Sequence, residues 1–241
     1  PYRRYDASTD DVFNGENELF QLTHRIDLTP DLSLTTIAYH HDFARNWYKL
    51  QGINSGGTGA SGDVSISSVL ADPVTYAAEY ALAVGTASLD DSIVYRANRR
   101  AYYSEGVQSV LNWKTAFGGI EHDLTIGARL HQDEEDRFQE EDAYRLEGGQ
   151  LILTTAGAAG SQANRISSGE ALALFVQDKF TLGRLSVTGG VRFEDYELTR
   201  EDYSTSDPTR AAGPTQVREL SDTVVVPGLS ALYEISETTT L

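Results

Sequence analysis

The chain has 241 residues, of which 40% are hydrophobic, and its formal net charge is −17 at pH 7. So large an acidic excess argues against nucleic acid as a partner, because phosphate binding depends on clustered Lys and Arg. No run approaches the roughly 18 consecutive apolar residues of a transmembrane helix, which excludes a helical membrane protein but not a β-barrel, whose strands alternate apolar and polar residues.

The first hairpin is predicted around a turn at Thr29–Asp31. From Glu18 to Leu28, apolar and polar residues alternate, as expected of a strand with one apolar face. The tripeptide Thr-Pro-Asp then favours a tight turn. The return strand runs from Leu32 to about Leu50, far longer than the typical five or six residues of a soluble strand.

A long loop is predicted from Gln51 to Ile93. Its first part, GINSGGTGASGD, is rich in Gly and Ser, and it does not lie between a strand and a helix with phosphate-binding spacing. Further along, Asp72 is expected to cap a short helix whose first position is Pro73.

The second hairpin is predicted to turn at Gly118-Gly119. Apolar residues share one parity in the strand before the turn and in the partner strand, EHDLTIGARLHQ. The continuation, DEEDRFQEEDAYRL, is too charged for hydrocarbon, so we expect it to project into water as a strand extension or a loop. An irregular stretch, EGGQLILTTAGAAGSQ, is expected to follow.

The third hairpin is predicted to turn at Gly183-Arg184, and a polar loop from about Ser204 to Asp222 leads into a last strand. In that strand one face is formed by Val225, Leu229, Ala231, Tyr233 and Ile235. This gives about seven strands, whose apolar stretches approach the ~9–11 residues that a tilted strand needs to cross a bilayer. Short turns on one side and long loops on the other are typical of outer-membrane barrels. We expect a curved, open sheet whose convex face leaves these side chains unusually exposed: Leu124, Ile126, Leu174, Val176, Val187 and Val191.

The segment ALALFVQDKFTLGRLSVTGGVRFEDYELTREDY resembles the paired-strand signature of TonB-dependent receptors. Within that family, the chain is most similar to the ferric-citrate and related ferric-siderophore receptors. The similar segments are NRRAYYSEGVQSVLNW, GARLHQDEEDRFQEEDAYRL, NRISSGEALALFVQD and, nearer the start, FARNWYKL. The resemblance covers roughly Arg96 to Tyr233.

The resemblance implies an all-β fold in which residues 1–241 are part of an antiparallel transmembrane β-barrel in the outer membrane of a Gram-negative bacterium. About seven strands cannot close the family's 22-stranded barrel. Because the sequence shows no plug domain, TonB box or terminal aromatic residue and starts at Pro1 without Met, we expect a fragment of a longer precursor. The implied partners are a ferric siderophore or ferric citrate, outer-membrane lipid and lipopolysaccharide, and TonB, reached through a plug segment outside this chain. The ferric chelate is the transported ligand, and no cofactor is implied.

Candidate ligand-binding residues follow from the charge of such a ligand. An anionic ferric chelate calls for guanidinium groups, which form charge-assisted, bidentate hydrogen bonds to carboxylates. The arginines near the loop ends of the predicted strands are Arg96, Arg99, Arg100, Arg137, Arg145 and Arg165. Arg99 and Arg100 are the preferred pair, since consecutive strand residues face opposite ways and one of them should point into the lumen. The alternative for each arginine is an ion pair with a neighbouring Asp or Glu.

The sequence predicts neither an enzyme nor a metal site. The acidic run from Asp133 to Asp142 lacks the spaced ligands and the Gly of a calcium-binding loop. No G-x-S-x-G, Walker or H-E-x-x-H motif is present. Four other functions stay open beside the ferric-chelate receptor: a TonB-dependent receptor for cobalamin or a sugar, a passive porin, a soluble β-sandwich binding module, and an outer-membrane hydrolase.

Overall fold

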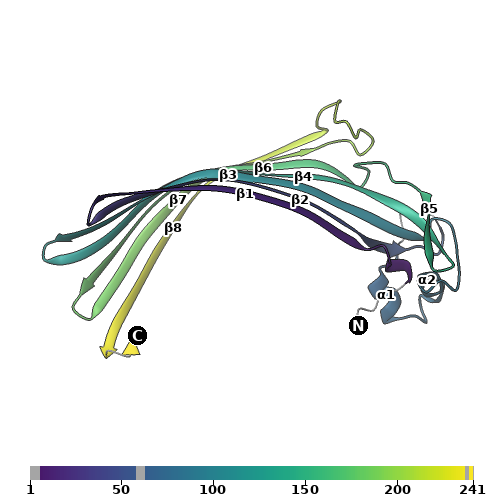
Figure 1. Cartoon of the computed structure of the whole chain (residues 1–241), viewed down its shortest axis with the longest axis horizontal. Helices are drawn as coiled ribbons and strands as arrows, with labels where there is room; N and C mark the ends of the chain where they lie inside the picture. Colours follow the sequence, from purple (N-terminus) through teal and green to yellow (C-terminus); the bar gives the residue numbers. More distant parts are fainter. Residues whose placement is uncertain (1–5, 58–62, 237–238, 241) are drawn as a thin grey trace.

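The computed structural model describes residues 6–57, 63–236 and 239–240. These residues form an antiparallel sheet in which the strands follow one another in chain order, with β5 pairing with β4 beside the main path (Figure 1). The long strands are β1 (Val12–Thr29), β2 (Leu32–Ile53), β3 (Ile93–Phe117), β4 (Ile120–Glu147), β6 (Ala163–Leu182), β7 (Leu185–Asp202) and β8 (Gln216–Ser236). The short elements are η1 (Asp6–Ser8), α1 (Ile66–Ala71), α2 (Ala77–Ala83), β5 (Gln150–Thr155) and β9 (Thr239–Thr240).

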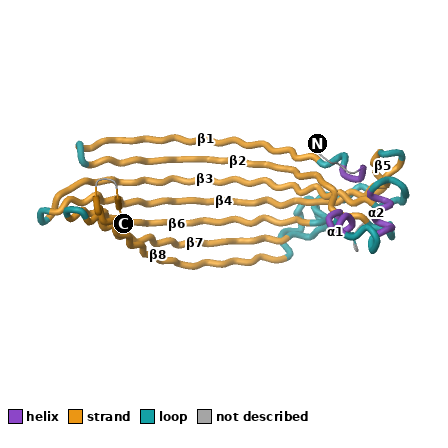
Figure 2. Tube along the Cα trace, turned by 90° about the horizontal axis from the view of Figure 1, so that it is seen from below, coloured by secondary structure: helices purple, strands orange, loops and turns teal. Residues whose placement is uncertain are grey.

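The two ends of the sheet differ in their connections. At one end, called the turn end, β1–β2, β3–β4 and β6–β7 are joined by two-residue turns at the three predicted places. Gly118 and Gly119 have φ of +62° and +79°, the left-handed region that favours glycine in hairpin turns. The long connections, with the two α-helices, gather at the other end, the loop end (Figure 2). No helix in the described ranges is long and apolar enough to cross a membrane.

The strand register defines two faces of the sheet. One row of directly opposed residues contains only apolar side chains: Leu34, Leu111, Ile126, Val176 and Val191. We call the face on which this row lies the apolar face. Because side chains alternate along a strand, residues of the other parity form the opposite face, which we call the polar face.

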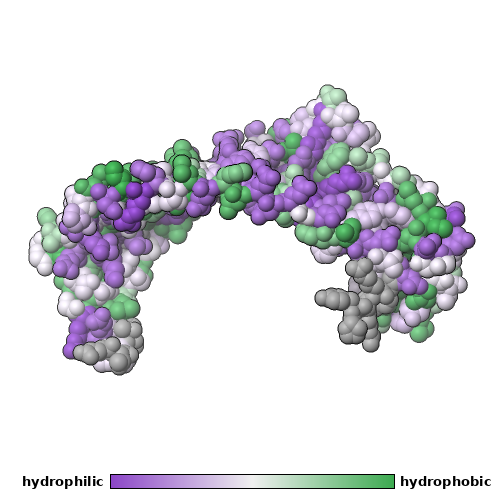
Figure 3. Space-filling model, in the orientation of Figure 1, coloured by the Kyte–Doolittle hydropathy of each residue, from purple (hydrophilic) through white to green (hydrophobic). Residues whose placement is uncertain are grey.

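The apolar side chains near the turn end are exposed. Ile126, Leu174, Val176 and Val191 are between 39% and 46% exposed, and Leu124 and Val187 are partly exposed. Hydrophobic and hydrophilic residues lie side by side on the visible surface of the arched molecule (Figure 3). A soluble β-sandwich would bury such residues in a closed core, so the prediction of a curved, open antiparallel sheet is confirmed.

The buried core lies at the loop end. It consists of Ala7, Leu50, Ile53, Leu82, Ala83, Ile93, Tyr95 and Leu146. The Tyr95 hydroxyl donates a hydrogen bond of 2.8 Å to the carbonyl of Ala7. This core fixes η1 and α2 against the apolar side of β2, β3 and β4, and so holds the loop-end part of these strands in place.

Two of the sequence predictions at the loop end are wrong. The stretch after Glu147 is not irregular, because Gly148-Gly149 forms a turn and β5 then pairs with the end of β4. The polar connection before the last strand ends earlier than Asp222, because β8 begins at Gln216. Neither β5 nor the start of β8 shows the alternation of apolar and polar residues that identifies the other strands.

The predicted short helix starts later than expected. The Asp72 carboxylate accepts a hydrogen bond of 3.0 Å from the Thr75 amide, as an N-cap would, but α2 begins only at Ala77. Asp72 is instead the C-cap of α1, a helix that was not predicted from the sequence.

Candidate ligand-binding site

A row of four arginines crosses the polar face near the loop end. Arg45 on β2 lies opposite Arg100 on β3, which lies opposite Arg137 on β4, and Arg137 lies opposite Arg165 on β6. We call these four residues the arginine row. Like charges directly opposite each other destabilise a sheet, so the row works against the fold unless an anion neutralises it.

Few carboxylates balance the arginine row. The Arg100 Nη1 atom lies 2.9 Å from the Glu135 carboxylate. Within the described part of the chain, no carboxylate lies within ion-pair distance of the other three arginines. Asp202 lies opposite Arg165, but it forms its ion pair with Arg200, at 2.6 Å. The row therefore keeps a local positive charge in a chain whose net charge is −17.

Arg137 is the most constrained member of the row. Its Nε atom is buried and has no hydrogen-bond partner among the described residues. Burial, together with the neighbouring Arg100 and Arg165, lowers the pKa of Arg137 from its usual value. The usual pKa of a guanidinium lies so far above neutrality that Arg137 stays protonated at neutral pH. A buried donor without a partner costs about 1–3 kcal/mol, which an incoming acceptor can recover.

An aromatic pair supports one end of the arginine row. The Tyr102 hydroxyl accepts hydrogen bonds from Arg45, at 3.4 Å, and from Arg100, at 3.3 Å. The Tyr102 ring stacks on Phe43, with 5.7 Å between the ring centroids. These contacts hold the two guanidinium groups beside each other on the polar face.

A groove of about 740 Å³ lies directly on the turn side of the arginine row. It crosses the polar face from β2 to β8, and its lining includes Phe43, Tyr102, Leu198, Arg200, Arg218 and Leu220. Its volume falls in the range of ~300–1,000 Å³ that small-molecule sites occupy. The row and the groove together form the candidate site.

The structure brings together three of the six arginines that the sequence singled out, namely Arg100, Arg137 and Arg165. Arg96 lies on the polar face beyond the row, and its Nε donates a hydrogen bond of 2.7 Å to Glu141. Arg99 lies on the opposite face, where it pairs with Glu140 at 2.8 Å. Both of these arginines therefore have a carboxylate partner already.

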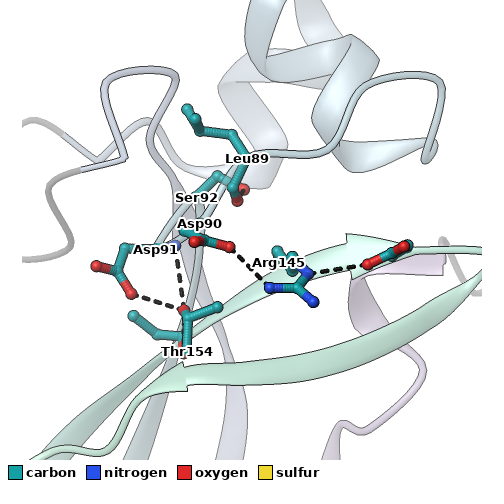
Figure 4. A network of polar contacts seen from close by, with 8 residues as sticks. Leu89, Asp90, Asp91, Ser92, Arg145 and Thr154 are labelled. Carbon is teal, nitrogen blue, oxygen red and sulfur yellow. Dashed lines mark hydrogen bonds and ion pairs between the residues drawn. The ribbon is translucent and has the colours of Figure 1, made fainter.

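Arg145 connects two loops rather than joining the row. Its guanidinium lies 3.0 Å from Asp90 and 2.9 Å from Glu147 (Figure 4). Beside it, the Thr154 hydroxyl donates a hydrogen bond of 2.6 Å to the Asp91 carboxylate and accepts one of 3.1 Å from the Asp91 amide. This network ties the β2–β3 connection to the β4–β5 hairpin, where an anionic ligand would have to compete with two carboxylates.

Sequence reasoning missed Arg45, Arg200 and Arg218. Arg45 lies in the segment FARNWYKL, and its only signal is the parity that places it on the polar face. The described residues contain no group of three His, Cys, Asp or Glu side chains that would hold a metal ion. The chemistry of the site is thus that of guanidinium groups beside apolar and aromatic side chains, with Asp133 and Glu135 as the acidic residues of the polar-face lining.

Comparison with known proteins gives one family and several solved structures. The family model described as "TonB dependent receptor-like, beta-barrel" matches residues 1–241. Among the curated proteins no sequence matches the chain. The similar structures include the ferric citrate transporter FecA in its unliganded form, with 18% identity and a TM-score of 0.66 over 95% of this chain and 27% of that one.

Two further structures are similar. The ferric-catecholate import receptor Fiu from E. coli K12 has 11% identity and a TM-score of 0.64 over 97% of this chain and 33% of that one. The siderophore receptor PiuA from Acinetobacter baumannii has 12% identity and a TM-score of 0.64 over 95% of this chain and 31% of that one. At these identities the likeness concerns the fold, and the chain spans about a third or less of the length of these proteins.

Proposed function

Because the chain belongs to the family of TonB-dependent receptor-like β-barrels, we propose that it forms part of the wall of an outer-membrane receptor that takes up a ferric siderophore or ferric citrate. The observation that carries the proposal is the arginine row on the polar face. Ferric complexes of carboxylate or phenolate chelators are anionic, and guanidinium groups bind such oxygens through short, charge-assisted hydrogen bonds.

In this proposal the turn-end half of the sheet crosses the membrane. On the apolar face, the stretches Val107–Phe117, Ile120–Leu130 and Leu172–Leu182 are each 11 residues long (117 − 107 + 1, 130 − 120 + 1 and 182 − 172 + 1). At ~3.3 Å per residue and a tilt of ~45°, 11 residues rise about 25 Å, the height of the apolar band of outer-membrane barrels. His122 and Asp178, which lie within these stretches, hydrogen-bond to each other at 2.7 Å.

The apolar face becomes acidic beyond these stretches. Toward the loop end its next side chains include Glu105, Glu134 and Glu170. Such a change from hydrocarbon-compatible to charged side chains within one strand supports a boundary between lipid and water at this level. The arginine row lies farther toward the loop end, so in the proposed receptor it faces the lumen above the membrane core.

The proposed receptor needs parts beyond these strands. The sheet is open, so we propose that further strands close it into a barrel and that a plug segment outside this chain contacts TonB. The outer partners of the apolar face are then membrane lipid and lipopolysaccharide. Sequence upstream of Pro1 that contains a plug and a TonB box would favour energised uptake over a passive porin.

The charge of the site favours an anionic chelate over other ligands of the same fold. A neutral sugar would leave the unpaired guanidinium groups of the row without a counter-charge. Cobalamin presents mainly amide groups to its surroundings and would neutralise the row no better. No feature of the described residues favours a sugar or cobalamin as the ligand.

A binding measurement with the full-length receptor tests the proposal. Purified receptor in detergent is titrated with ferric citrate and with a ferric complex of an anionic siderophore, at low and at high salt. We expect saturable binding of a ferric chelate that weakens as salt rises, because screening reduces the attraction between separated charges. Binding of a neutral sugar or cobalamin without binding of either ferric chelate would contradict the proposal.

A further inference from the structure

Two leucines lie on the polar face next to charged residues, with Arg200 and Arg218 on their loop side and Asp222 on their turn side. Leu198 on β7 and Leu220 on β8 lie directly opposite each other and are 45% and 56% exposed. Both lie in the loop-end half of their strands, beyond the stretch that the proposed membrane covers. In that position water, rather than lipid, faces them, so their exposure costs hydrophobic free energy unless a ligand or another segment covers them.

The leucines lie across the groove from a second apolar surface, with Glu135 on β4 and Ser167 on β6 between the two. Phe43 and Tyr102, stacked on each other, line the groove from β2 and β3, whereas Leu198 and Leu220 line it from β7 and β8. The groove thus has an apolar surface at both of its sides, within a volume of about 740 Å³.

Cationic groups border the same groove on two sides. The arginine row runs along its loop side, and Arg200 lies opposite Arg218 at the β7–β8 end. In the described part of the chain, Arg218 has no ion pair, and its guanidinium donates a hydrogen bond of 2.7 Å to the Gln216 side chain. Between these margins, Asp133 and Glu135 on β4 also line the groove, and Glu135 is paired with Arg100. The groove therefore combines apolar contact area with guanidinium groups that outnumber the carboxylates on the polar face.

From this combination we infer that the site takes an anionic ferric chelate with aromatic or apolar groups, and that a small hydroxycarboxylate complex such as ferric citrate is a poor ligand. The inference rests on the proposed function, since it names the class of chelate that the same site accepts. Ferric citrate would satisfy the arginines, but its surface is almost wholly polar, so it would leave the leucines and the aromatic pair uncovered. A chelate whose donor oxygens are carried on aromatic rings satisfies both requirements at once.

The test compares two probes on the full-length receptor and on two variants. The probes are ferric citrate and ferric tris(2,3-dihydroxybenzoate), which is anionic and carries aromatic rings. The first variant combines Leu198→Ser with Leu220→Ser. The matched control is Val217→Ser, a residue of β8 that is 47% exposed on the opposite face. All of the substituted side chains are exposed, so the variants are expected to assemble with normal yield.

We expect the unaltered receptor to bind the aromatic probe at least tenfold more tightly than ferric citrate. The double leucine variant should lose about tenfold in affinity for the aromatic probe and less than twofold for ferric citrate. The control should bind both probes as the unaltered receptor does. Equal or tighter binding of ferric citrate, with no effect of the leucine substitutions, would overturn the inference and leave the proposed function standing.

A third variant distinguishes failure of the proposed function from failure of this inference alone. Arg137→Gln should weaken binding of both probes, because both are anions. If neither ferric probe binds to the unaltered receptor at micromolar concentration, the proposed function fails and this inference fails with it. If both probes bind and only Arg137→Gln weakens them, the arginine row is retained as the site and the requirement for an apolar group is rejected.

Discussion

The turn end and the loop end of the same strands carry opposite chemistry, although one hydrogen-bonded ladder runs through both. At the turn end, β4 presents Ile126 on one face beside residues of the other parity that are mainly polar or small. At the loop end, the same strand presents Glu134 on that face and Arg137 on the other. In the proposed receptor, the side chains therefore decide which region meets lipid and which meets water and ligand.

This difference also explains the length of the strands. A strand needs only ~9–11 residues to cross a bilayer, whereas β4 has 28 residues and β3 has 25. The additional residues carry the arginine row and the groove. In the proposed receptor, strand length is therefore set by the position of the ligand site as well as by the membrane.

The largest expected effect comes from placing a charge on the apolar face near the turn end. Val176→Lys places a charge in the middle of the apolar stretch of β6 and should cost about 2–4 kcal/mol of barrel stability. The control is Ser168→Lys, on the same strand and the same face but toward the loop end. Urea unfolding of the receptor in lipid vesicles measures both free energies. Equal tolerance of the two substitutions would contradict the assignment of the apolar face to lipid.

The second prediction concerns the loop end. Arg137→Gln should weaken ferric-chelate binding about 10–100-fold, since a hydrogen bond to a charged group is worth about 1.5–3 kcal/mol. The same substitution should leave the fold equally stable or stabilise it by up to ~1 kcal/mol, because it removes two like-charge cross-strand contacts. Chelate titration and urea unfolding measure the two quantities.

Arg99→Gln serves as the control for Arg137→Gln. Arg99 has the same charge and lies on β3, but on the opposite face and paired with Glu140. We expect its substitution to leave chelate affinity unchanged. A larger loss of affinity in the Arg99 variant than in the Arg137 variant would place the ligand on the apolar face and contradict the proposed site.

A third substitution changes packing near the turn end without changing any charge. A Cβ atom on Gly127 would lie 2.1 Å from the Phe175 ring, which covers this glycine on the polar face. Gly127→Ala should therefore destabilise the barrel by about 1–3 kcal/mol. Adding Phe175→Leu should restore part of that loss, and chelate affinity should not change. If Gly127→Ala leaves the free energy of unfolding in urea unchanged, the close contact between Gly127 and the Phe175 ring is incorrect.

The smallest expected effect concerns the loop network around Arg145. Its partners Asp90 and Glu147 have side chains that are 68% and 61% exposed, so solvent screens each pair and the pairs contribute little to stability. Arg145→Ala should raise the hydrogen exchange rate of the Asp91 amide a few-fold, because it loosens the contact between the two loops. Chelate affinity should stay within twofold, and a loss comparable to that of Arg137→Gln would extend the binding site to Arg145.

The fold could be predicted from the sequence because the patterns that determine it are local. The turns at Gly118-Gly119 and Gly183-Arg184 are set by adjacent residues, and period-2 alternation assigns the apolar residues to one face. The same reasoning failed where this alternation ends. The first residues of β8, from Gln216, are mostly polar on both faces and therefore resemble a loop.

The site was harder to predict because it depends on register between strands that are far apart in the chain. Arg45 and Arg100 lie opposite each other only because β2 and β3 pair across a connection that runs from residue 54 to residue 92. No short turn fixes that register, so counting along the sequence cannot align the two arginines. The sequence indicated that one of Arg99 and Arg100 points inward, and the parity of β3 relative to Leu111 places Arg100 on the polar face.

The central claim, that the ligand lies on the polar face beside the arginine row, can be tested by thiol protection. The chain contains no cysteine. Ser167 and Ser168 are adjacent residues of β6 whose side chains lie on opposite faces. Ser167 lines the groove on the polar face, directly opposite Glu135 on β4 and Arg200 on β7. Ser167→Cys and Ser168→Cys variants of the full-length receptor in detergent are labelled with a maleimide, with and without a saturating ferric chelate. We predict that the chelate slows labelling in the Ser167 variant and leaves the Ser168 variant unaffected, whereas protection of the Ser168 variant alone would contradict the account.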